Sequence, residues 1–190
     1  MSSRTFAEPS GSRVPWDDPE VEVLRGIELP KVSPRRTHGI LQGAFFELLH
    51  AWGSDRGDVG TEWRFHIPNR SGGEDTLIPD VAFVAAEVLD ALSDDEVEEP
   101  HVAPTIAVEI RSPGDRPRNI SVKALSYIEA GTRLVVDVDP AAREIVAHGA
   151  DGSMRFIDGT AFAHPLAPGL RFDVSEFFDR AKRKRPQRPV

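Results

Sequence analysis

The sequence contains no cysteine in its 190 residues. This absence excludes disulfide bonds, thiolate zinc sites and a cysteine nucleophile. The sequence also has no apolar run long enough to cross a bilayer, and residues 1–19 are polar and proline-containing, unlike the apolar segment of a secretory signal. We therefore expect a soluble, cytoplasmic protein.

The length and composition predict one folded domain. With 39% hydrophobic side chains, 190 residues are enough for one ordinary core and too few to favour two. We expect this domain to span residues 20–179, between a polar leader at 1–19 and a basic tail at 180–190.

The charge is negative overall but unevenly distributed. A net charge of −8 argues against a protein that coats itself in nucleic acid, because lysine and arginine supply most non-specific affinity for phosphate. Seven of the acids lie in residues 87–99, which contain no base, so the rest of the chain carries −1. Residues 180–188 contain six bases. Such a tail can bind phosphate, or it can simply be solvated.

Apolar alternation and short apolar runs predict a central β-sheet. The segments with this pattern are residues 21–29, 63–67, 77–84, 105–111, 133–138, 144–148 and 153–157. The last two should form a hairpin, and the glycines at 57–60 and 72–73 indicate turns.

Two helices of functional interest are predicted by their apolar spacing. The first runs from Thr37, a candidate N-cap, to Trp52. The second spans residues 119–130, with a buried stripe of Ile120, Ala124, Leu125 and Ile128. The acidic residues between 85 and 99 suggest a short helix and loop. Residues 110–138 then form a strand, helix, strand unit, which favours parallel pairing. The fold class is α+β, with a mixed sheet and flanking helices.

Two acids interrupt the apolar strands. Asp80 lies in 77–84 and Glu109 in 105–111, where the period of two places Glu109 and Arg111 on one face. Burying an acid costs several kcal/mol unless it is paired or bound to a cation. Lys123 and Tyr127, four residues apart, lie together on the edge of the second helix and can reach over the sheet.

Two interpretations of these residues remain open. Two carboxylates can bind a hard divalent ion, most simply Mg²⁺, and a nearby ammonium can stabilise charge that develops in a transition state. Two carboxylates and an ammonium are the groups that a phosphodiester hydrolase with a single metal ion needs. Alternatively, Asp80 and Glu109 form buried ion pairs with Arg111 and Lys123 and have no part in catalysis.

An ordered set of short segments resembles the Uma2 family of restriction-endonuclease-like proteins, which is assigned to the PD-(D/E)xK nuclease superfamily. The resemblance covers residues 20–179. Its central segments are residues 78–84, 108–115, Lys123, Tyr127, 130–131 and 136–140. At the ends, residues 23–28 with Pro34 and His38 resemble the N-terminal hairpin and first helix of the family, and residues 166–170 with 177–178 resemble its closing segment.

The resemblance implies a restriction-endonuclease-like core in which Asp80 and Glu109 bind the metal. The superfamily signature has lysine two residues after the second acid, where this sequence has Arg111. Members of the Uma2 family generally lack that lysine too, and the resemblance implies that Lys123, on the second helix, takes its place. Because arginine stays protonated, Arg111 could contact phosphate or hold a carboxylate but could not act as a base.

The resemblance implies that the first helix also contributes supporting residues to the site. His38 is one of them, and either Glu47 or Gln42 could complete the site. Helical angles place Glu47 and Gln42 on opposite edges of the apolar stripe, so at most one should face inward.

The leading hypothesis is therefore an endonuclease, dependent on Mg²⁺ or Mn²⁺, that hydrolyses phosphodiester bonds of DNA. Restriction-like folds commonly dimerise, which makes a homodimer an expectation as well. The alternative is a catalytically inactive nuclease-fold module that binds nucleic acid or a protein partner, using the basic tail. A third interpretation is a structural or regulatory domain whose acids are only paired.

Overall fold

The computed structural model describes residues 21–31, 35–113, 115 and 117–182. The predicted leader at 1–19, Pro34, and residues 183–190 of the predicted tail lie outside the described residues. No helix within the described ranges is both long enough and apolar enough to cross a membrane.

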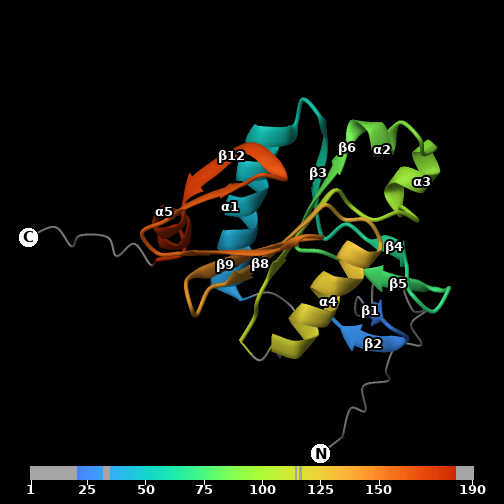
Figure 1. The fold of residues 1–190 in the computed structure, drawn as a ribbon, viewed down its shortest axis with the longest axis horizontal. Coiled ribbons are helices and arrows are strands. Elements are labelled where there is room, and N and C mark those ends of the chain that lie inside the picture. Colours follow the sequence, from blue (N-terminus) through green and yellow to red (C-terminus); the bar gives the residue numbers. More distant parts are fainter. Residues whose placement is uncertain (1–20, 32–34, 114, 116, 183–190) are drawn as a thin grey trace, which may run out of the picture.

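A six-stranded sheet forms the centre of the fold (Figure 1), in the order β10-β9-β8-β7-β6-β3. Its strands are β3 (Gly57–Thr61), β6 (Val81–Ala85), β7 (Ile106–Ile110), β8 (Leu134–Asp139), β9 (Glu144–Gly149) and β10 (Gly152–Ile157). β7 and β8 are parallel, as the strand, helix, strand unit predicts, and the other neighbours are antiparallel. The sheet is therefore mixed, and the predicted β9–β10 hairpin is confirmed.

Two helices cover opposite faces of this sheet: α1 (Arg36–Gly53) and α4 (Pro117–Glu129) (Figure 1). Alternate residues of the strands belong to two separate cores. Val108 and Ile110 of β7 pack in the core that contains α1, whereas Ala107 packs with Tyr127 of α4. This alternation confirms the face assignment predicted from the period of two, and it directs Glu109 toward α4.

A smaller sheet, in the order β2-β1-β5-β4, packs on the α4 side. Its strands are β1 (Val21–Leu24), β2 (Ile27–Pro30), β4 (Phe65–Pro68) and β5 (Glu74–Leu77). The single strand predicted over 21–29 is in fact a hairpin, because Arg25 and Gly26 adopt positive φ angles of 52° and 76°. A two-residue turn of this kind matches the twist of antiparallel strands.

The chain closes with the β11 (Ala161–His164) and β12 (Ala167–Asp173) pair and α5 (Val174–Asp179). These elements pack on α1 through aromatic side chains. The ring of Phe45 meets those of Phe162, Phe172 and Phe177 edge-on, at centroid distances of 6.5, 5.7 and 5.5 Å.

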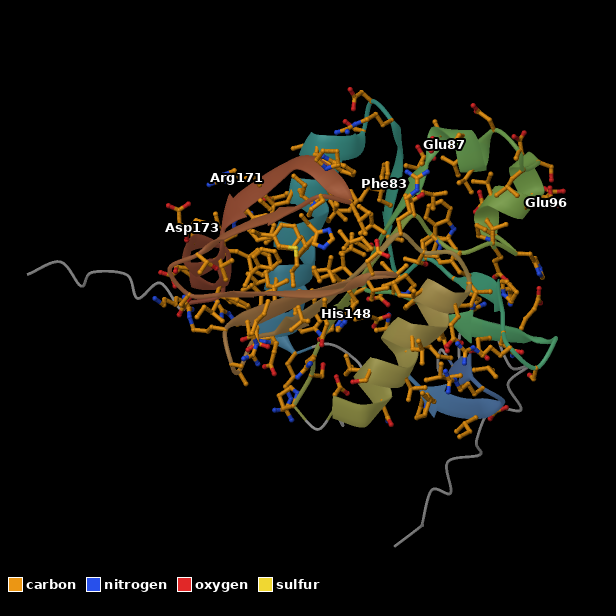
Figure 2. The ribbon with its side chains drawn as sticks, viewed as in Figure 1. Phe83, Glu87, Glu96, His148, Arg171 and Asp173 are labelled. Carbon is orange, nitrogen blue, oxygen red and sulfur yellow. The ribbon has the colours of Figure 1, made fainter. Side chains whose placement is uncertain are left out.

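The acidic residues between 87 and 99 form two short helices, α2 (Ala86–Leu89) and α3 (Asp94–Glu98). Ser93 and Glu96 make a reciprocal capping box at the start of α3. Glu87 and Glu96 are exposed, and Figure 2 shows them on the outer surface of these helices.

The strand predicted over 77–84 is divided, because β5 ends at Leu77 and β6 begins at Val81, so that Asp80 lies in the connection between them. Three further local predictions are wrong. Thr37 lies inside α1, which begins at Arg36 after Arg35 and has no side-chain cap. Leu125 is 44% exposed, since Lys123 and Tyr127 face inward and a residue midway between them must face outward. Residues 57–60 are not a turn but belong to the edge strand β3, where a glycine is needed at Gly57.

Gly57 provides a stability test. A Cβ atom there would lie 2.1 Å from the carbonyl oxygen of Val84, a backbone atom that cannot move aside easily. We expect Gly57→Ala to lower the free energy of unfolding by roughly 1–3 kcal/mol. Gly43→Ala is the control, because nothing lies within 4 Å of a Cβ in that helical position. It should stabilise the protein by about 0.5–1 kcal/mol. Urea unfolding measures the stability of both variants, and equal changes in the two would contradict the close approach of Gly57 to the Val84 carbonyl oxygen.

Candidate active site

The two predicted acids lie opposite each other at the end of the β6–β7 pair. Val81 is paired with Val108, so one further step in this register brings Asp80 to Glu109. β7 continues to Ile110, whereas β6 begins only at Val81. Pro79, which has no N–H to donate, lies in the connection between β5 and β6. The unpaired N–H of Ile110 donates instead to Asp80 Oδ2 at 2.6 Å.

Glu109 is held by the second helix, as the sequence predicts. Lys123 Nζ lies 2.7 Å from Glu109 Oε2, and Tyr127 OH donates to Oε1 at 3.0 Å. The same ammonium lies 2.7 Å from Glu22 Oε1 of β1. That oxygen also accepts the N–H of Ile78 at 2.8 Å. One lysine thus joins two carboxylates from different sheets.

Burial determines the protonation of this group. Glu22, Glu109 and Lys123 are each less than a tenth exposed. Burial raises the pKa of Glu109 to about 8, an effect that the Glu22 and Asp80 carboxylates increase and Lys123 opposes. Burial lowers the pKa of Lys123, but Glu109 and Glu22 outweigh it and the pKa lies above its usual value. Lys123 therefore stays protonated.

Tyr127 also keeps its proton. Burial, together with the nearby Glu109 and Glu22 carboxylates, raises its pKa well above the ordinary value. Its hydroxyl therefore acts as a fixed donor to Glu109.

Asp80 lies between His38 and Lys31. Its Oδ1 is 3.3 Å from His38 Nε2 and 3.4 Å from Lys31 Nζ. Burial raises the pKa of Asp80, but the contacts with His38 and Lys31 outweigh it and hold the pKa below its usual value. Burial also lowers the pKa of His38, and Asp80 reverses this effect. His38 Nδ1 meets Ser112 Oγ at 3.2 Å.

Gln42 is the first-helix residue that faces this site. Its Nε2 donates to Glu62 Oε1 at 2.6 Å and to the carbonyl oxygen of Asp80 at 3.0 Å. Glu47 lies elsewhere, with its carboxylate 2.6 Å from Arg180 Nη1. This placement agrees with the prediction that at most one of Gln42 and Glu47 faces inward.

Arg111 pairs with the neighbouring strand β8. Its Nε donates to Asp137 Oδ1 at 2.8 Å and its Nη1 to Asp139 Oδ2 at 2.9 Å. Of its two predicted uses, phosphate contact or holding a carboxylate, the structure displays the second. The carboxylates it holds are not those of Asp80 and Glu109.

The predicted catalytic residues meet in one cleft of about 200 Å³. Asp80, Glu109 and Lys123 line it together with Glu22, Lys31, His38 and Ser112. The described residues that line this cleft include none of the seven acids from 87 to 99. The acidic residues of this segment therefore add no negative charge to the lining of the cleft.

The sequence reasoning did not assign a role to Glu22, Lys31 or Glu62. Glu22 lies on the buried face of β1 together with Leu24, and Lys31 and Glu62 lie just beyond β2 and β3. No residue spacing marks them, because their partners are distant in sequence.

The donor set fits a divalent cation. His38, Glu62 and Asp80 each offer one ligand atom, and these atoms lie within 4.8 Å of one another. The Glu109 carboxylate lines the cleft together with His38 and Asp80. Carboxylate oxygens suit Mg²⁺, and a mixture of carboxylate and imidazole also suits Mn²⁺.

This mixed sheet, flanked by helices and carrying paired acids at a strand end, defines the class of restriction-endonuclease-like folds. The model of the Uma2 family, described as "putative restriction endonuclease", matches residues 13–180. The chain therefore belongs to the Uma2 family, and the predicted family and fold class are confirmed.

A solved structure has a similar fold. It is described as a "putative nuclease belonging to DUF820" from Anabaena variabilis ATCC 29413. The match has a TM-score of 0.76 at 17% identity and covers 86% of this chain and 92% of that one. No curated protein matches the chain.

The buried Lys123 group provides a second stability test. Lys123→Met leaves the buried Glu22 carboxylate without its cation and Glu109 without the Lys123 donor, and removing one partner of a buried pair costs roughly 3–5 kcal/mol. We expect the free energy of unfolding in urea to fall by that amount at neutral pH. Lys182→Met is the control, because this side chain is 66% exposed and should change stability by less than about 0.5 kcal/mol. Similar losses in the two variants would contradict the proposed strength of the buried pair.

Proposed function

We propose that the protein is an endonuclease that hydrolyses phosphodiester bonds of DNA and depends on Mg²⁺ or Mn²⁺. The observation that carries the proposal is the juxtaposition of Asp80, directly before β6, and Glu109 on the adjacent strand β7, with Lys123 2.7 Å from Glu109. The family description supports the nuclease class. The choice of DNA rather than RNA follows from the restriction endonucleases after which the family is described.

The roles of the residues follow from their contacts. A bound divalent ion would polarise a phosphoryl oxygen and lower the pKa of a water molecule. Asp80, oriented by the Ile110 N–H, and Glu109, oriented by Tyr127, would hold that ion. Because Lys123 stays protonated, it cannot accept the proton of the water molecule. It would instead stabilise the negative charge that develops on the phosphoryl group.

The nuclease proposal predicts metal-dependent cleavage. Purified protein should nick or linearise supercoiled plasmid DNA when Mg²⁺ or Mn²⁺ is added. Asp80→Asn and Glu109→Gln should each reduce the rate by about 100-fold or more, since both remove a ligand charge. Asp151→Asn, in the turn between β9 and β10, removes a carboxylate outside the cleft and should cleave normally. Gel electrophoresis separates the products, and undiminished cleavage by both ligand variants would refute the proposal.

One observation favours a second candidate function, a nuclease-fold module that binds without cutting. Lys123 and Glu109 are already paired, and Glu22 shares the same ammonium. A site with all its charges paired can be purely structural. In that case the protein would bind labelled DNA with no cleavage in either metal, and deleting the basic tail, residues 180–190, would remove the binding.

A further inference from the structure

Lys31 places a cation at the centre of the Asp80 site. The residue follows β2 directly, and its side chain is only 17% exposed. Its Nζ donates to the carbonyl oxygen of Ile78 at 2.6 Å, lies 3.4 Å from Asp80 Oδ1 and contacts the Glu62 carboxylate. Oxygens of Ile78 and Asp80, from one connection, and of Glu62, from beyond β3, thus surround one ammonium.

Two of these oxygens also belong to the group that could hold a metal. Asp80, Glu62 and His38 each have a ligand atom within 4.8 Å of the others. Among the described residues, Glu62 Oε2 is buried and has no donor other than the Lys31 ammonium. A divalent ion that binds Asp80 and Glu62 must take the place of that ammonium, because both cations need the same oxygens.

The oxygens are held in position independently of Lys31. Gln42 Nε2 bridges Glu62 Oε1 and the Asp80 carbonyl oxygen, at 2.6 and 3.0 Å. The Ile110 N–H fixes the other Asp80 carboxylate oxygen. Groups that orient metal ligands in this way raise affinity by reducing the cost of ordering the ligands on binding.

We propose that Asp80, Glu62 and His38 form a divalent-cation site beside the Asp80–Glu109 pair, and that the Lys31 ammonium occupies it until the ion displaces it. The site shares Asp80 with the proposed nuclease function and in that respect rests on it. The roles of Glu62, His38 and Lys31 concern binding alone. Lys31 is therefore a competing cation, and its removal should strengthen metal binding.

Titration calorimetry of the full chain with MnCl₂ tests this competition. Lys31→Met should bind Mn²⁺ about 10-fold more tightly than the wild type, which corresponds to roughly 1.4 kcal/mol. Mn²⁺ should also raise the melting temperature of this variant more than that of the wild type. Lys182→Met makes the same change in net charge at an exposed site and should leave Mn²⁺ affinity unchanged. Unchanged or weaker binding by Lys31→Met would overturn the proposal.

A second variant covers the case in which Lys31→Met does not fold. Lys31→Gln keeps a donor for the Ile78 carbonyl oxygen while removing the charge, and it should also bind Mn²⁺ more tightly.

Ligand variants separate this site from the metal site of the proposed nuclease. Glu62→Gln and His38→Gln should each weaken Mn²⁺ binding by about 10-fold or more. If Glu109→Gln alone weakens binding, the Glu62 and His38 site is wrong although the Asp80–Glu109 site stands. If Glu62→Gln and His38→Gln weaken binding but no variant or wild type cleaves DNA, the cation site stands and the nuclease function fails.

Discussion

The buried ammonium of Lys123 is the interaction on which the cleft depends. It joins α4 to β7 through Glu109 and to β1 through Glu22, and so connects the six-stranded sheet with the smaller one. Burying two carboxylates this close together would cost several kcal/mol for each, and the shared cation offsets this cost. Glu22 also accepts the N–H of Ile78, two residues before Asp80. The same network therefore positions the segment that carries the second acid.

The position of Asp80 follows from how the sheet ends. β7 extends past the beginning of β6, and its Ile110 N–H has no strand partner on that side. A buried N–H must find an acceptor, and the Asp80 carboxylate provides one. Pro79 keeps the preceding residues out of the ladder, so the Asp80 side chain can turn toward β7 and toward His38 of α1. Asp80 thus accepts the N–H of Ile110 and is at the same time a proposed metal ligand.

Local patterns predicted the elements that hold the site but not its full set of residues. Strand alternation placed Glu109 on the α4 face, and helical spacing placed Lys123 beside Tyr127, because both depend only on neighbours in sequence. Glu22 and Lys31 bond to Ile78 across 56 and 47 residues, distances over which no periodicity carries information. The edge strand β3 was missed since its glycines indicate a turn, and only its packing against β6 explains them. The β11–β12 pair and α5 have no sequence signal beyond the family resemblance.

The charge balance of the cleft bears on the order in which ligands would bind. Four acidic side chains line it, from Glu22, Asp80, Glu109 and Asp115, against the two ammonium groups of Lys31 and Lys123. Both ammonium groups are already paired with carboxylates, so a phosphodiester that approached the metal-free cleft would find neither of them free to bind it. A divalent ion would add positive charge to the cleft and, by displacing Lys31 from Asp80 and Glu62, would release an ammonium for the incoming anion. In the proposed function, binding of the cation first would therefore favour binding of the nucleic acid, which would also help a chain of net charge −8 to accept an anionic substrate.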